Sequence, residues 1–278
     1  MNRLWEWFEQ QVLFYEGSTR TAGLLRILLA LLMWARWGTA VAPFTNATPE
    51  RLLLGVSFYI STTLMLFGVS SRFSTAWAGG TALVMAFGFG NNGVEAWAHH
   101  HTTLLALSVA MCALTPCGHS YSYDRWLAVR RSDVPPTERA PLWGMRLIGF
   151  HVSVVYFWTA WDKTFWGFLS GERMEMAFHT LYLGSDFAEF PGFGEALMVI
   201  SIMTVTLEYA LAFLLWVPRW QWWTFPVGFA LHAIIYITLP VATFTVTMYA
   251  LYLAYLDPDQ FHDWIDRISG HEPAAVNS

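Results

Sequence analysis

Charged side chains are scarce in this chain of 278 residues, at 13% of the total, whereas hydrophobic residues make up 55%. A soluble globular domain carries about twice that charged fraction. The shortage therefore excludes an ordinary soluble domain. The net charge of -5 also leaves no basic surface for a nucleic-acid backbone. The composition predicts an integral membrane protein that contacts membrane lipids and binds no nucleic acid.

Cysteine and lysine are scarcer still. The two cysteines, Cys112 and Cys117, are five residues apart, a spacing that on one helix turns them about 140° away from each other. We therefore expect no disulfide between them, and their number excludes a disulfide-rich secreted domain. Lys163 is the single lysine, because every other basic residue among the 15 is an arginine.

Long apolar runs dominate what is present. Each of eight runs is long enough for a bilayer core about 30 Å thick at about 1.5 Å per residue. The runs lie near residues 22–42, 52–70, 74–91, 99–118, 143–163, 194–217, 222–239 and 241–256. The last two are interrupted only by Pro240, which is compatible with two spans or with one broken helix. We predict an all-α, polytopic helical membrane bundle of about eight transmembrane helices.

The segments around the spans suggest a domain organisation. Residues 1–21 mix aromatic and charged side chains, which predicts an interfacial amphipathic helix with its lead-in, although a surface helix packed on the bundle fits equally well. Residues 22–256 would be the transmembrane domain and residues 257–278 a short cytoplasmic tail.

The distribution of arginine predicts the orientation. With the N-terminus inside, nine arginines fall in cytoplasmic segments and two, Arg51 and Arg173, on the opposite side. By the positive-inside rule both termini and the 119–142 loop face the cytoplasm. We expect a multi-pass protein of the inner (plasma) membrane.

Ionisable side chains within apolar spans need a physical reason, because each costs free energy unless it is paired or wet. They are Arg26, Arg36, His101, Arg146, His151, Lys163, Glu208 and His232. Glu208 lies at a depth similar to Arg26 and Arg146, which predicts a structural ion pair between Glu208 and one of these arginines. A proton-relay role for Glu208 is the alternative.

Lys163 lies among Trp158, Trp161 and Trp166 at the outer end of its span. Arginine stays protonated in proteins, whereas a desolvated lysine can lose its proton and act as a base. The alternative is a lysine that extends to the lipid headgroups within a belt of tryptophans. His101 is the deepest of three consecutive histidines and is predicted at a similar outer depth, so the two side chains could share a pocket. The three imidazoles cannot all bind one ion, and we predict no metal site.

Several motifs together resemble one family. They are GLLRILLALLMW at 23–34, HHHTTLLALSVAMCALTPCGHSYSYDRW at 99–126, YFWTAWDKTFWGFLSG at 156–171, LEYALAFLLWVPRW at 207–220, LHAIIYI at 231–237 and LYLAYLDP at 251–258. In order and spacing, over nearly the whole chain, they resemble the HTTM family, membrane proteins similar to the transmembrane domain of vitamin K-dependent gamma-glutamyl carboxylase.

The resemblance implies a chemistry. In the carboxylase, a membrane lysine takes a proton from a reduced naphthoquinone, oxygen adds, and the resulting base removes a proton from glutamate so that carbon dioxide can add. The base matches Lys163, and an assisting histidine matches His101. The family enzyme has an asparagine where this chain has His100. The resemblance thus implies catalytic residues Lys163 and His101, and a reduced quinone, similar to vitamin K hydroquinone, as cofactor. The residues expected to bind it are His100, Trp158, Trp161, Trp166 and His232.

One departure from the family is large. The carboxylase carries a large lumenal domain for its peptide substrate, whereas this chain stops about 22 residues after Leu256. Peptide carboxylation is therefore not implied, and a separate soluble or membrane partner is expected in place of that domain.

Three functions fit the sequence. The first is a quinol-dependent enzyme, a lyase similar to vitamin K-dependent gamma-carboxylase, with an outward-facing pocket and Lys163 as base. The second is a non-catalytic membrane partner protein that binds a quinone or a lipid. The third is a solute carrier, which the absence of internal repeats disfavours.

Overall fold

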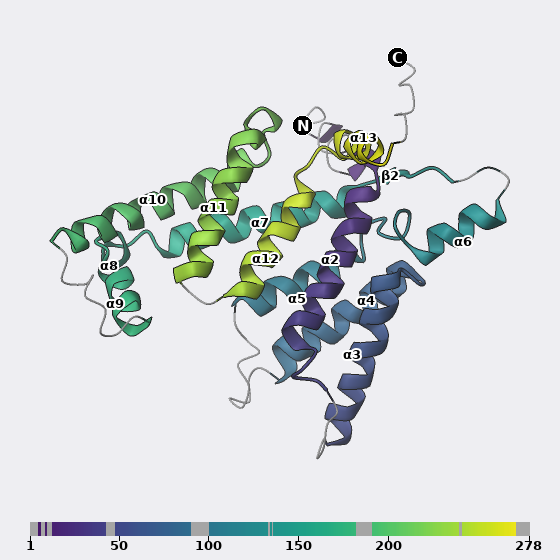
Figure 1. Cartoon of the computed structure of the whole chain (residues 1–278), viewed down its shortest axis with the longest axis horizontal. Helices are drawn as coiled ribbons and strands as arrows, with labels where there is room; N and C mark the ends of the chain where they lie inside the picture. Colours follow the sequence, from purple (N-terminus) through teal and green to yellow (C-terminus); the bar gives the residue numbers. More distant parts are fainter. Residues whose placement is uncertain are drawn as a thin grey trace. The chain divides into compact units, whose positions relative to one another are not determined.

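The computed structural model describes residues 5–6, 9, 13–42, 48–89, 100–132, 134, 136–181, 191–238 and 241–270. Apart from two short strands, the regular elements in these ranges are helices, which confirms the all-α class (Figure 1). The chain divides into two compact units. Unit 1 comprises Met1–Gly149 and Ala242–Ser278, and unit 2 comprises Phe150–Val241.

A helix lies at each predicted span. These helices are α2 (Arg20–Trp37), α3 (Pro49–Phe67), α4 (Ser71–Leu83) with the π-helix η2 (Val84–Phe89), α5 (His100–Cys112), α7 (Trp143–Asp162), α10 (Phe193–Leu214), α11 (Gln221–Thr238), and α12 (Ala242–Leu251) with the 3-10 helix η6 (Tyr252–Ala254). The last apolar stretch thus contains two helices. Among the described helices, α3 and α10 are long and apolar enough to cross a membrane. The count of eight crossings stays a prediction.

Several elements were not predicted. They are α6 (Tyr123–Arg131), α8 (Trp166–Leu169), α9 (Glu172–Leu181), the 3-10 helix η5 (Pro218–Trp220), α13 (Pro258–Ile268), and the strands β1 (Glu16–Ser18) and β2 (Arg139–Pro141). β1 and β2 pair antiparallel, with Gly17 opposite Ala140. Three residues of the predicted interfacial helix therefore form a strand, and most of those before them lie outside the described residues.

The cysteines do not share a helix. α5 ends at Cys112, and the chain then turns, with the Thr115 amide donating to the Cys112 carbonyl at 3.0 Å. The 140° separation assumed an uninterrupted helix and does not apply. Both thiols are free and buried.

Helix α2 is central to the core of unit 1. It packs against α3, α5 and α12, and its Leu25, Leu29 and Met33 side chains are fully buried. α4 approaches α5 so closely that a Cβ atom on Gly79 would lie 2.7 Å from the Ala110 Cα. Small residues at helix contacts are typical of membrane bundles, where van der Waals packing holds helices together.

Polar contacts connect the two strands of unit 1 to its last helix. Arg20 pairs with Glu138 at 3.0 Å and with Asp266 at 2.5 Å. His262 lies 3.1 Å from Asp266 and shares a hydrogen bond of 2.9 Å with the Ser18 hydroxyl. This arginine-centred network joins β1, the start of α2, the segment before β2, and α13.

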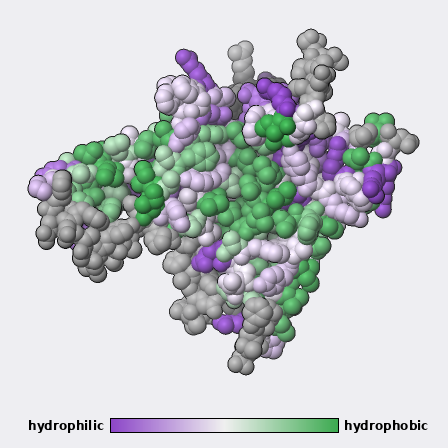
Figure 2. Space-filling model, in the orientation of Figure 1, coloured by the Kyte–Doolittle hydropathy of each residue, from purple (hydrophilic) through white to green (hydrophobic). Residues whose placement is uncertain are grey.

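In unit 2, α10 packs against α8, α9 and α11. Large apolar side chains remain at the surface of both units, including Leu53 at 71% exposure and Met203 at 56%. Figure 2 shows hydrophobic residues on the surfaces of α3 and α10. Such surfaces suit contact with lipid and would be costly in water.

Candidate functional site

Lys163 directly follows α7 and continues the face of that helix on which Tyr156 lies. Seven residues make almost two helical turns, so the side chains point in nearly the same direction, about 10 Å apart along the axis. The Lys163 amide still donates to the carbonyls of Thr159 and Ala160, at 3.3 and 3.2 Å, and therefore closes the last turn of the helix. The polar side chains of Tyr156 and Lys163 therefore lie on the same side of the helix.

The centre of the site is an ion pair between Lys163 and Glu208. Lys163 Nζ donates to both carboxylate oxygens of Glu208, at 2.6 and 2.8 Å. Glu208 lies on α10 with 6% of its side chain exposed, whereas 28% of the Lys163 side chain is exposed. The buried carboxylate is thus satisfied by the cation, and the cation keeps access to the surface.

A second polar pair connects α7 to α11. The Tyr156 hydroxyl and His232 Nε2, from α11, are 2.6 Å apart, and each residue is only 2% exposed. The Lys163–Glu208 and Tyr156–His232 pairs both lie within unit 2, and the four residues are together called the polar cluster.

The structure changes the predicted partner of Glu208. Instead of pairing with Arg26 or Arg146, the carboxylate pairs with Lys163. Arg26 donates through Nη2 to the Tyr121 carbonyl at 2.6 Å, and the Arg146 guanidinium lies 4.0 Å from the centre of the Tyr15 ring. The prediction rested on the similar depth of Glu208, Arg26 and Arg146 in their spans. Depth alone does not determine which helices are neighbours.

The tryptophans predicted to wall Lys163 face away from it. Trp158 is 59% exposed, Trp161 60% and Trp166 76%. On α7, Trp158 and Trp161 are turned about 140° and 160° from Lys163, which explains their outward direction. The Lys163 ammonium lies 6.0 Å from the centre of the Phe168 ring. In a bilayer, exposed tryptophans fit the interfacial belt named above as the alternative.

His100 and His101 open α5, but their side chains lie outside the described residues. A pocket shared by His101 and Lys163 therefore stays a prediction. Within the described ranges, no group of three histidine, cysteine, aspartate or glutamate side chains could hold a metal ion.

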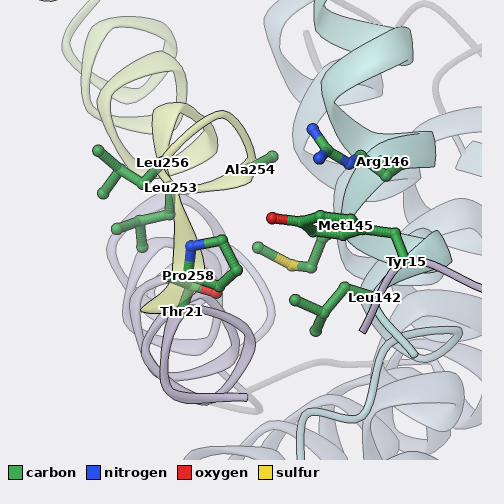
Figure 3. A pocket seen from close by; sticks show the side chains of 9 residues that line it. All are labelled: Tyr15, Thr21, Leu142, Met145, Arg146, Leu253, Ala254, Leu256 and Pro258. Carbon is green, nitrogen blue, oxygen red and sulfur yellow. The ribbon is translucent and has the colours of Figure 1, made fainter. Parts of the chain in front are cut away.

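Two concavities belong to unit 1, and neither includes Lys163. The first has a volume of about 10 Å³, room for about one water molecule. In Figure 3, Leu253, Ala254, Leu256 and Pro258 face Leu142, Met145 and Arg146 across it. The second is an open groove of about 610 Å³, the aromatic groove, lined by Phe67, Val69, Tyr121, Ser122, Tyr123 and Trp126.

Tyr156 is the member of the polar cluster that the sequence analysis missed. It stands in an apolar run, YFW, where a tyrosine is unremarkable. Its seven-residue spacing from Lys163 was the available signal, because that spacing puts both on one helix face.

Two of the described helices, α3 and α10, are apolar and long enough to span a membrane, and an ion pair connects Lys163 to Glu208 on α10. These features are those of a helical membrane protein. The chain belongs to the HTTM family, since the model of the HTTM domain matches residues 49–260. That domain is found in vitamin K-dependent carboxylase. Comparisons with curated proteins and with solved structures give no match.

Proposed function

We propose that this chain is a multi-pass membrane enzyme that binds a quinol beside Lys163 and removes a proton from it. The observation that carries the proposal is the bidentate Lys163–Glu208 pair, which places a basic group with access to the surface 2.6 Å from a buried acidic group. Membership of the HTTM family, which includes vitamin K-dependent carboxylase, supports quinol chemistry for this pair.

The donor set of Lys163 fits a quinol oxygen. An ammonium group has three N–H donors. Glu208 accepts two hydrogen bonds from Nζ, and no described residue accepts a third. Because 28% of the lysine side chain is exposed, the remaining N–H can reach a hydroxyl oxygen outside the pair. A bound quinol would supply an acidic hydroxyl and, after losing its proton, two reducing electrons.

The geometry supports a proton relay through the pair. When Nζ passes a proton to the Glu208 oxygen 2.6 Å away, the lysine becomes a neutral amine with a free lone pair. That amine can take the quinol proton and again become an ammonium, which balances the negative charge left on the bound oxygen. Lys163 is then the base and Glu208 the proton store. Tyr156 and His232, next along the cluster, would hold this arrangement in place.

The test compares Lys163→Arg with the wild type. Arginine keeps the positive charge and can still bond Glu208 with two N–H groups, but it does not give up its proton. We expect the variant to fold and to bind reduced naphthoquinone in proteoliposomes, and to lose the oxygen consumption that this quinol drives. Asp162→Asn, which alters an adjacent exposed acid, is the matched control and should keep wild-type turnover.

Two results would contradict the proposal. Wild-type turnover in the arginine variant would remove Lys163 as the base. Binding of the quinone without any oxygen consumption by the wild type would instead favour a non-catalytic quinone- or lipid-binding protein, in which the ion pair is structural.

A further inference from the structure

The aromatic groove of unit 1 has no role in the chemistry above. It is lined by the C-terminal end of α3, the turn that follows it, and the start of α6. Its volume of about 610 Å³ falls in the range of about 300–1,000 Å³ that is typical of small-molecule sites. Phe67 is 63% exposed, and Tyr123 and Trp126 stack with ring centres 5.3 Å apart. The groove therefore offers an apolar, aromatic surface.

A buried cation lies directly behind this surface. Arg26 is fully buried, and its Nη2 donates to the carbonyl of the groove residue Tyr121. A Cβ atom on Gly68, between two groove residues, would lie 1.8 Å from Arg26 Nη1. Gly68 has φ 67°, a left-handed conformation that ends α3 and that glycine adopts without strain. The turn thus passes within contact distance of the guanidinium.

Two donors of Arg26 are unsatisfied. Its Nε and Nη1 have no hydrogen-bond partner among the described residues. Buried guanidinium groups in membrane proteins normally face an anion or several carbonyls, because an uncompensated buried charge is costly. Both atoms are enclosed, so a ligand in the groove does not bond them directly. No described carboxylate forms an ion pair with Arg26, so its positive charge acts through the turn on whatever occupies the groove.

The rim of the groove is also positive. Arg130 lies 4.1 Å from the centre of the Trp126 ring. Arg125, on the same helix, is partly balanced, because it lies 3.9 Å from a Glu138 carboxylate oxygen. Asp124, the acid on α6, is already engaged, since its side chain accepts from the Ser70 and Ser71 amides and the Ser71 hydroxyl.

We propose that the aromatic groove binds one anionic phospholipid. Its phosphate lies between the Arg26 side of the groove and the arginines of α6, and an acyl chain lies along Phe67 and the aromatic rings. Charge complementarity selects this occupant, because a zwitterionic headgroup would bring its own cation against the arginines. The tryptophan and the adjacent arginine resemble other interfacial anchors, which favour the level of the headgroups.

The test measures lipid binding to the delipidated full chain by native mass spectrometry. The probes are dioctanoyl phosphatidylglycerol, dioctanoyl phosphatidylcholine and inorganic phosphate. We expect phosphatidylglycerol to bind about tenfold more tightly than phosphatidylcholine, the difference that one charge-assisted hydrogen bond produces. Inorganic phosphate should compete weakly, because it lacks the acyl chains.

The variants are Trp126→Ala and Arg130→Gln, which change exposed side chains and leave the buried Arg26 intact. Each should reduce the preference for phosphatidylglycerol several-fold. Trp264→Ala and Arg267→Gln on α13 alter a similar exposed pair elsewhere in unit 1 and should leave that preference unchanged.

Three outcomes would overturn the proposal. They are equal affinity for the two lipids, an equal loss in the α13 controls, and competition by inorganic phosphate at the concentration at which the lipid binds. The last would mean that the groove takes a soluble phosphate.

Discussion

At the scale of single residues, the Lys163–Glu208 pair is asymmetric. Glu208 is 6% exposed and Lys163 28% exposed. Removing the lysine by Lys163→Gln leaves a carboxylate that cannot reach water, and we expect a loss of about 3 kcal/mol in the free energy of unfolding. Glu208→Gln leaves an ammonium that can turn toward water or headgroups, with a loss of about 1 kcal/mol.

Thermal unfolding of the detergent-solubilised variants measures both effects. The exchanged pair, Lys163→Glu with Glu208→Lys, should recover part of the lost stability, because opposite charges again meet. Equal losses in the two single variants would contradict the asymmetry, and no loss in either would mean that the pair contributes nothing to the fold.

The sequence identified both members of this pair but not their pairing. A charged residue in an apolar run is visible without a structure, and both Lys163 and Glu208 stand in such runs. The neighbour of Glu208 depends on which face of α7 lies against α10, and apolar runs such as these carry little information about rotation. The outward direction of Trp158 could not be predicted for the same reason. Sequence spacing gives the angle between the Trp158 and Lys163 side chains, but it does not tell which of them faces the interior of the bundle.

At the scale of elements, the last helix has a strong start signal. The Asp257 side chain accepts from the amides of Asp259 and Gln260, and Pro258 occupies the first helical position. Asp257→Ala should remove this cap and lower stability by about 1 kcal/mol. Asp257→Asn keeps an accepting oxygen and should cost less. Circular dichroism melts can rank the three proteins, and an alanine variant as stable as the asparagine variant would contradict a capping role.

The long helices were predictable and the short ones were not. The predicted span at 143–163 corresponds to α7 at Trp143–Asp162. A continuous apolar sequence indicates both that a helix is present and approximately where it begins and ends. α6 and α13 carry many charges and are short, so a search for apolar runs passes over them. β1 pairs with a strand more than a hundred residues away, and no local pattern indicates such pairing.

At the scale of the whole molecule, the orientation in the membrane is open to a direct test. A cysteine at Ser132, exposed at the end of α6, should be protected from an impermeant thiol reagent in intact cells and react after lysis. A cysteine at Arg173 should react in intact cells. The native thiols should give little background, because both are buried. The reverse labelling pattern would invert the proposed topology.

The arginine-centred network of unit 1 constrains the order in which the protein can be completed. Arg20 emerges early from the ribosome, but its partner Asp266 lies 246 positions later, after all of unit 2 has been synthesised. Until then, the strand at Glu16–Ser18 and the guanidinium lack the contacts that α13 supplies. The final closure of unit 1 therefore follows the synthesis of unit 2, and an arrested nascent chain that ends before α13 would hold the other helices with this junction still open.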